Sequence, residues 1–223
     1  GIAAANLHIC QIQSKNNMIR NIIFDFGGVI YDIDHNLSKI AFEKLGVINF
    51  DQLYGHHIQS KIFEKMERGE LELDVFRNEL RKVFSRKVSD LQLDDAWCGL
   101  LLGFDTAKLD LLKSIKKNYR LFLLSNSNEI HYLRFIKELN AYTDFRSLFD
   151  DVWFSHEKGV RKPEPESYLG LLSSNQLQAS ESLFIDDLDL NIEAAINHGI
   201  KTHYIQNSSI LDMFEDGKLK MDY

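Results

Sequence analysis

Acidic residues stand at the ends of two short apolar runs in this chain. Asp25 closes the first run and is followed by Gly27 and Gly28, and the pair Asp186-Asp187 closes a later run. A carboxylate beside glycines, which let the backbone approach a ligand, suits a nucleophile or a metal ligand. Adjacent carboxylates directly after a buried run are costly unless they bind a cation, and their hard oxygens suit Mg²⁺. The simpler alternative is that these residues only cap neighbouring elements.

A hydroxyl, an amide and a lysine could act on an anion beside these carboxylates. Ser125 and Asn126 end another apolar run, where they could hold a phosphate oxygen or cap the next helix. Lys162 precedes the only two prolines of the chain, which would stiffen its loop. It could present a positive charge to a phosphoryl group or be a solvated surface lysine. Because Lys158 and Arg161 lie beside it, composition does not settle which of the three acts.

The elements that must position these residues follow from the apolar pattern. Five runs rich in Ile, Val, Leu and Phe predict strands buried on both faces of a parallel sheet, at residues 21–26, 120–124, 152–154, 183–185 and 202–205. Helical patterns separate most of them, at residues 108–117, 129–139, 166–172 and 191–198. Alternating strands and helices predict an α/β fold with a Rossmann-like parallel sheet as its core. In such a sheet, ligands bind beyond the carboxyl ends of the strands.

The segment between the first two predicted strands is about ninety residues long, far more than a crossover connection needs. Its apolar spacing predicts four short amphipathic helices, the first of which is expected to bury Leu37 and Ile40. We therefore predict an inserted helical cap domain at 33–104 and an α/β core formed by 19–32 and 105–223. Residues 1–18 show no clear pattern and are interpreted as an N-terminal extension, native or vector-derived.

Composition excludes several classes of partner. The net charge of −7 argues against a nucleic-acid partner. No apolar run approaches the roughly 18 residues that span a bilayer, and no basic stretch precedes an apolar core as in a secretory signal. Cys10 and Cys98 fit neither a disulfide framework nor a zinc site, which favours a reducing compartment. A cytoplasmic monomer or homodimer is therefore expected, with no membrane partner.

Four motifs, in their order and residue types, resemble those of the haloacid dehalogenase-like (HAD) superfamily. They are Asp25-Phe26-Gly27-Gly28, Leu124-Ser125-Asn126, Arg161-Lys162-Pro163 and Asp186-Asp187. The resemblance covers residues 19–206, and the inserted helices match the position of the first cap domain of that superfamily. Three further runs resemble the subgroup that contains bacterial α-D-glucose-1-phosphate phosphatase: Asp32-Ile33-Asp34, Glu67-Arg68-Gly69-Glu70 and Ser125-Asn126-Ser127-Asn128.

The resemblance implies a Mg²⁺-dependent phosphatase for a small phosphorylated metabolite, such as a sugar 1-phosphate. Asp25 would attack phosphorus and form an aspartyl-phosphate, which water then hydrolyses. The implied protein ligands of Mg²⁺ are the carboxylates of Asp25 and Asp186 and the backbone carbonyl of Gly27. Asp187 would hold a metal-bound water or orient Lys162.

Charge on the transferring phosphoryl oxygens would be stabilised by side chains and backbone N–H groups. The resemblance implies phosphate contacts from Ser125, Asn126, Lys162, Gly27 and Gly28. Cap residues would choose the substrate by closing over the site. Three of them could reach a ligand, although a solvent-facing position also fits each: His56, His57 and Arg68.

One departure from the family pattern concerns the proton donor. Most phosphatases of the superfamily carry a second Asp two residues after the nucleophile, where this chain has Gly27. General acid–base help is worth roughly 10²–10⁴-fold in rate. The substrate could have a better leaving group, such as an anomeric oxygen, or another group could supply the proton, or the protein could be catalytically weak. The candidate donors are Asp34, His35, His56 and His57.

Three alternatives to a hydrolytic phosphatase stay open at this stage. A metal-independent haloacid dehalogenase could use the same fold, but Asp186 and Asp187 would repel an anionic haloacid without a bridging cation. A catalytically weak ligand-binding protein is suggested by the missing acid at Gly27. Phosphoryl transfer between sugars is a weaker option, since mutases rely on that missing acid.

Overall fold

The computed structural model describes residues 18–47 and 57–223, so all but the last residue of the predicted extension lies outside the described part. A five-stranded parallel sheet forms the core, in the order β5-β4-β1-β6-β7. Its strands are β1 (Asn21–Phe24), β4 (Arg120–Ser125), β5 (Asp151–Phe154), β6 (Ser182–Asp186) and β7 (Lys201–Tyr204). Each lies on one of the five predicted runs, with ends that differ by one or two residues. The predicted Rossmann-like fold is therefore confirmed.

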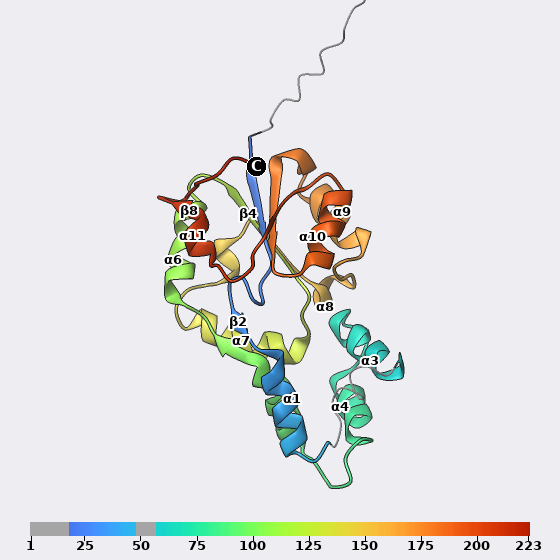
Figure 1. Cartoon of the computed structure of the whole chain (residues 1–223). Helices are drawn as coiled ribbons and strands as arrows, with labels where there is room; N and C mark the ends of the chain where they lie inside the picture. Colours follow the sequence, from blue (N-terminus) through green and yellow to red (C-terminus); the bar gives the residue numbers. More distant parts are fainter. Residues whose placement is uncertain (1–17, 48–56) are drawn as a thin grey trace, which may run out of the picture.

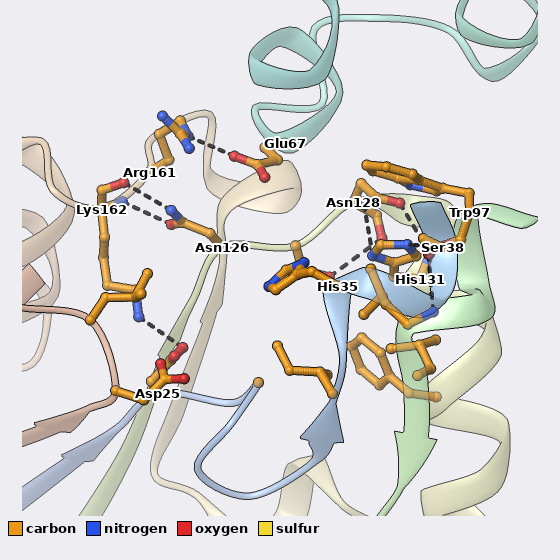
Figure 2. Close-up of a pocket in the computed structure, with 18 of the residues that line it drawn as sticks. Asp25, His35, Ser38, Glu67, Trp97, Asn126, Asn128, His131, Arg161 and Lys162 are labelled. Atoms are coloured by element: carbon orange, nitrogen blue, oxygen red, sulfur yellow. Dashed lines mark hydrogen bonds and ion pairs between the residues drawn. The ribbon is translucent and has the colours of Figure 1, made fainter. Parts of the chain in front are cut away.

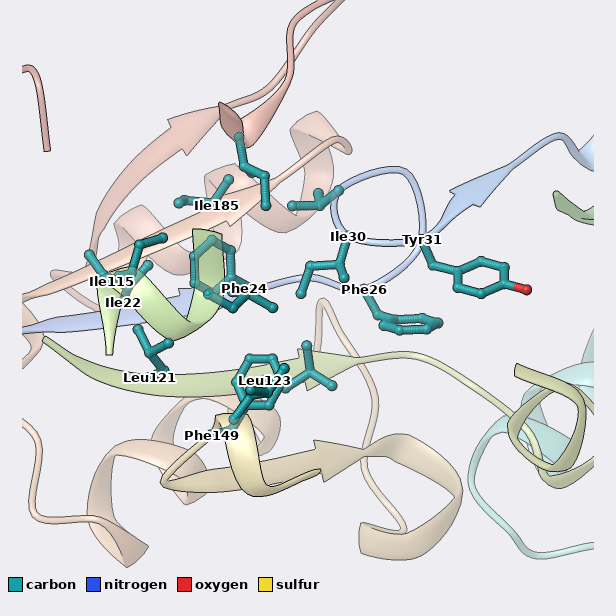
Figure 3. Close-up of a cluster of buried hydrophobic side chains, with 14 of the residues drawn as sticks. Ile22, Phe24, Phe26, Ile30, Tyr31, Ile115, Leu121, Leu123, Phe149 and Ile185 are labelled. Atoms are coloured by element: carbon teal, nitrogen blue, oxygen red, sulfur yellow. The ribbon is translucent and has the colours of Figure 1, made fainter. Parts of the chain in front are cut away.

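Helices cover both faces of this sheet (Figure 1). They are α6 (Thr106–Ile115), α7 (Glu129–Asn140), α9 (Pro165–Ser174) and α10 (Asp189–Asn197). Alternation along β1 divides the core in two: Ile22 and Phe24 belong to the hydrophobic cluster with α6 and α7, and Ile23 belongs to the cluster with α9 and α10. Figure 3 shows the first of these clusters around Phe24. Each fully buried Ile or Phe contributes about 1.5–3 kcal/mol.

Several short elements were not predicted, because too few residues are involved to show a period. They are α8 (Ser155–Lys158), α11 (Ile210–Met213), a hairpin of β8 (Phe214–Glu215) with β9 (Lys218–Leu219), and the 3-10 helices η2 (Arg146–Leu148) and η3 (Ala179–Glu181). Within the described residues, no helix is long and apolar enough to cross a membrane.

A helical cap is inserted between two short strands, β2 (Asp32–Ile33) and β3 (Leu101–Gly103), which pair antiparallel. It contains α1 (His35–Lys44), α3 (His57–Glu67), α4 (Leu73–Arg81), α5 (Asp90–Trp97) and the 3-10 helix η1 (Cys98–Leu100). A separate hydrophobic cluster, with Phe42, Phe63, Phe76 and Trp97 as its aromatic members, holds these helices together. In Figure 1 the cap lies beyond the carboxyl ends of the core strands.

Helix α1 is turned differently from the prediction. Leu37 is 36% exposed and Ile40 is 42% exposed, whereas Ser38 and Phe42 are buried. The Ser38 hydroxyl donates to the Trp97 carbonyl at 2.8 Å, and Phe42 packs against the Trp97 ring. These contacts fix the rotation of α1, so a polar anchor and one large ring outweigh the two smaller apolar side chains.

Candidate active site

The residues singled out from the sequence gather at one end of the sheet. Asp25 directly follows β1, Ser125 ends β4 and Asp186 ends β6. Because β1 lies between β4 and β6, these three strand ends are neighbours. Lys162 reaches the same place from the loop between α8 and α9. The topology thus brings together residues that are far apart in the sequence.

Three carboxylates form the centre of this site. Asp25, Asp186 and Asp187 each place an oxygen within 4.8 Å of the others. Asp186 is fully buried, and its Oδ1 accepts from the Leu188 backbone N–H at 2.8 Å. Burial raises the pKa of Asp25 above its ordinary range against the opposing charge of Lys162, and the neighbouring carboxylates raise it further. Burial and then the charge of Asp186 likewise raise the pKa of Asp187. Such crowding favours a bound cation.

Lys162 supplies a fixed positive charge to the carboxylates. Its Nζ lies 2.8 Å from Asp25 Oδ1 and 2.5 Å from Asp186 Oδ2, and the side chain is almost completely buried. Burial by itself lowers the pKa of this lysine, but the two carboxylates outweigh burial and raise it, so the ammonium stays charged. Lys158 instead lies over the Trp153 ring, 4.8 Å from its centroid. The geometry therefore selects Lys162 over its neighbour.

Asn126 holds the backbone of that lysine at both of its hydrogen-bonding groups. Its amide donates to the Lys162 carbonyl at 2.8 Å, and its carbonyl accepts from the Lys162 N–H at 2.8 Å. This side chain is thereby committed to positioning Lys162. Ser125 is buried, and its hydroxyl lies 3.3 Å from the Asn126 carbonyl oxygen.

The two glycines after Asp25 leave space for neighbouring side chains. Gly28 has a φ of +77°, and a Cβ there would lie 2.2 Å from Asp187 Oδ2. A Cβ at Gly27 would meet the Ile33 side chain at 3.0 Å. An apolar side chain therefore lies against the place that a side chain at position 27 would begin to fill.

A cavity of about 520 Å³ opens between these core residues and the cap. Its wall includes Asp25, Lys162 and Asp187 from the core and His35 and Trp97 from the cap. Figure 2 shows Lys162 running down to Asp25 on one side and Trp97 with His131 on the other. The volume suits a small metabolite.

His131 belongs to this cavity but was not identified from the sequence. Its Nε2 lies 3.0 Å from the Trp97 carbonyl oxygen, and its Nδ1 lies 3.0 Å from the Asn128 amide nitrogen. The carbonyl requires a donor and the amide nitrogen requires an acceptor, so the ring is the neutral Nε2–H tautomer. Burial lowers the pKa of His131 to about 4. It is a rigid wall of the cavity, and the only signal in the sequence was its position three residues after Asn128.

The cap residues proposed for specificity or proton transfer lie in different places, and not all of them face the cavity. Arg68 forms a two-pronged ion pair with Glu164 of the core. Asp34 accepts from the Asn36 N–H as the N-cap of α1, whereas His35 lines the cavity. His56 and the side chain of His57 lie outside the described residues.

The parallel sheet, the carboxylate cluster at its edge and the buried lysine can now be compared with known protein families. A family model described as haloacid dehalogenase-like hydrolase matches residues 19–199, and the chain belongs to this family. It is 34% identical over 199 residues to D-ribitol-5-phosphate phosphatase of Bacteroides thetaiotaomicron, covering 86% of this chain and 94% of that protein. It is 28% identical to a sesquiterpene phosphatase of Aspergillus oryzae, covering 78% of this chain and 83% of the relative.

Solved structures show the same fold. A HAD family enzyme of Bacteroides thetaiotaomicron, in complex with magnesium and inorganic phosphate, superposes with a TM-score of 0.81 at 31% identity, covering 88% of this chain and 100% of that one. A HAD-like hydrolase of Porphyromonas gingivalis gives 0.74 at 30% identity, covering 86% and 93%. L-2-haloacid dehalogenase of Xanthobacter autotrophicus gives 0.56 at 17% identity, covering 88% and 81%, which is a likeness of fold alone.

Proposed function

We propose that this protein is a Mg²⁺-dependent phosphatase that hydrolyses a small phosphorylated sugar or sugar alcohol through an aspartyl-phosphate on Asp25. The observation that carries this proposal is the cluster of Asp25, Asp186 and Asp187, the first two paired with the buried Lys162, at the wall of a metabolite-sized cavity. Membership in a hydrolase family and similarity to two proteins named as phosphatases support it.

The donor set fits magnesium. Three carboxylate oxygens within 4.8 Å of one another are hard ligands, and the crowding of like charges favours a bound cation. We assign Asp25, Asp186 and the backbone carbonyl of Gly27 as protein ligands, with Asp187 holding a metal-bound water. Mg²⁺, when bound, would neutralise charge between the nucleophile and the phosphate.

The residues of the site then have defined roles in the proposed reaction. Asp25 attacks phosphorus as the bond between phosphorus and the leaving-group oxygen breaks, and water then hydrolyses the aspartyl-phosphate to release phosphate and restore the carboxylate. Lys162 neutralises charge on the transferring oxygens, and Asn126 keeps that lysine in place. Ser125 and the backbone N–H of Gly27 are assigned to the same oxygens. The phosphate contact predicted for Gly28 is not supported, because its N–H donates to the Tyr31 carbonyl at 2.8 Å. The cap covers the cavity and limits the access of bulk water, while one water is admitted to hydrolyse the aspartyl-phosphate.

The close approach of Gly28 to Asp187 leads to a prediction. In Gly28→Ala the added Cβ displaces the Asp187 carboxylate, which can rotate away, so metal binding suffers more than folding. The Mg²⁺ concentration for half-maximal activity should rise roughly 10–100-fold, as expected when a group around a metal site is disturbed. A magnesium titration of phosphatase activity measures this.

Gly159→Ala is the matched control for that prediction. Gly159 has a similar φ of +73°, but nothing lies within 4 Å of the place that a Cβ would take there. This variant should lose about 1–2 kcal/mol of stability from backbone strain, with an unchanged magnesium requirement. An equal magnesium requirement in the two variants would refute the proposed role of Asp187.

Two observations bear on the chemical class of the leaving group. With Gly27 in place of a carboxylate, an anomeric oxygen, which departs with less protonation, would be favoured. The relative that is 34% identical is named for D-ribitol 5-phosphate, a primary alkyl phosphate of a sugar alcohol. The first observation favours an anomeric leaving group and the second a sugar alcohol, so sugar 1-phosphates and sugar alcohol phosphates are the first substrates to assay.

Removal of the metal tests the proposed function. With Mg²⁺, the protein should release phosphate from a panel containing glucose 1-phosphate and D-ribitol 5-phosphate. Excess EDTA should lower the rate at least about 100-fold, because several kcal/mol of charge stabilisation is lost, and added Mg²⁺ should restore it. Halide release from 2-chloropropionate that persists in EDTA, without phosphate release, would identify a dehalogenase instead.

A further inference from the structure

The cap contacts the core beside Lys162 through two ion pairs. In one pair the cap supplies the acidic residue, and in the other it supplies the basic residue. Glu67, the last residue of α3, accepts from Arg161 Nε at 2.7 Å. Arg68, the next residue, forms the two-pronged pair with Glu164. Neighbouring residues of the cap thus bind residues on either side of the Lys162-Pro163 segment, with opposite charges in each pair.

The backbone of the turn after α3 lies close to the core at this contact. Gly69 has a φ of +66°, and a Cβ there would lie 2.1 Å from the His156 carbonyl oxygen. The turn after α3 therefore packs its backbone directly against His156 of α8, where a side chain would not fit. The cap also contacts the core near its hinge, where the Trp97 carbonyl meets His131 and Arg134 pairs with Asp95. The cavity lies between these two contacts.

The two ion pairs differ in what they face. Glu67 and Arg161 line the cavity, whereas Arg68 and Glu164 do not. Only one oxygen of Glu67 and only Nε of Arg161 are used in their pair. Among the described residues, no side chain bonds Glu67 Oε1 or the two Nη groups of Arg161. The inner pair thus presents an acceptor and several donors to the cavity, and the outer pair holds them in place.

We propose that Glu67 and Arg161 recognise hydroxyl groups of the leaving group, and so select polyhydroxylated phosphates over phosphates that lack hydroxyls. A vicinal diol can donate to the carboxylate and accept from the guanidinium at once. Arg161 adjoins Lys162, whose side chain runs down to Asp25 (Figure 2). A phosphate held at Asp25 and Lys162 therefore directs its leaving group toward this pair. The inference rests on the proposed function and adds the substrate class.

The test compares kcat/KM for D-ribitol 5-phosphate and glucose 1-phosphate with that for p-nitrophenyl phosphate, in the presence of Mg²⁺. Glu67→Gln should lower kcat/KM for either polyhydroxylated phosphate, relative to that for p-nitrophenyl phosphate, about 10-fold, chiefly through KM. Arg161→Lys, which keeps the charge but loses the planar fork, should lower the same ratio. Glu64→Gln, the same change on an exposed position of α3, should leave it unchanged.

The inference is overturned if the ratio is unchanged in both Glu67→Gln and Arg161→Lys, as it would be after an equal loss with all substrates. An equal loss would mean that the inner pair only holds the cap. Turnover of p-nitrophenyl phosphate by the parent, abolished by EDTA, shows that the proposed function stands when this inference fails. A parent inactive on every phosphate ester would overturn the proposed function itself.

Discussion

Replacing Asp25 with Asn should lower kcat/KM for every phosphate ester at least about 10⁴-fold, because the amide cannot take the phosphoryl group. The side chain keeps its shape, and its oxygen can still face Lys162, so the fold should be retained. The measurement is phosphate release at saturating Mg²⁺ with the best substrate of the panel, alongside a thermal melt.

Asp189→Asn is the matched control for Asp25→Asn. Asp189 is an exposed carboxylate only two positions after Asp187, and its Oδ1 accepts from the neighbouring Leu190 N–H. This control should retain parental activity. If the Asn variant at position 25 cleaves phosphate esters as fast as the control, Asp25 is not the nucleophile and the mechanism is wrong.

Lys162→Met should impair both catalysis and folding. Loss of one preorganised positive charge at the transferring oxygens costs about 10²–10³-fold in kcat. The substitution also leaves Asp25 and Asp186 buried without their shared cation, since Nζ contacts both. Breaking a buried ion pair in this way costs about 3–5 kcal/mol. Urea unfolding without Mg²⁺ measures the second effect, and turnover with Mg²⁺ measures the first.

Lys158→Met separates these effects from the loss of any nearby lysine. Lys158 lies on the same stretch of chain, over the Trp153 ring, and among the described residues it has no contact with the three carboxylates of the site. Its replacement should cost less than about 1 kcal/mol, as for a surface cation. Equal unfolding midpoints for Lys158→Met and Lys162→Met would contradict the buried network around Asp25.

The sheet and the order of the motifs could be predicted because strand periodicity and strand-end chemistry are local properties. Asp25, Ser125 and Asp186 each stand at the end of a short apolar run, and the carboxyl ends of parallel strands meet at one edge. The choice of Lys162 over Lys158 could not be made in this way. It depends on which side chain points inward, and that is decided by the hydrogen bonds between Asn126 and the Lys162 backbone.

The cavity walls are tertiary features that leave little trace in the sequence. His131 becomes part of the site only because its ring bridges Trp97 of the cap and Asn128 of the core. Glu67 and Arg161 are 94 positions apart, and each alone resembles a solvated surface charge. Which face of α1 is buried was likewise decided by contacts with Trp97, as the exposure of Leu37 shows.

A structure of the protein with Mg²⁺ and beryllium fluoride, a mimic of the phosphoryl group, tests the central claim most directly. The account predicts the fluoride complex bonded to a carboxylate oxygen of Asp25, with Lys162 beside it and Mg²⁺ between Asp25 and Asp186. A beryllium fluoride that bonds to another carboxylate, or a Mg²⁺ ion bound away from these three residues, would contradict it.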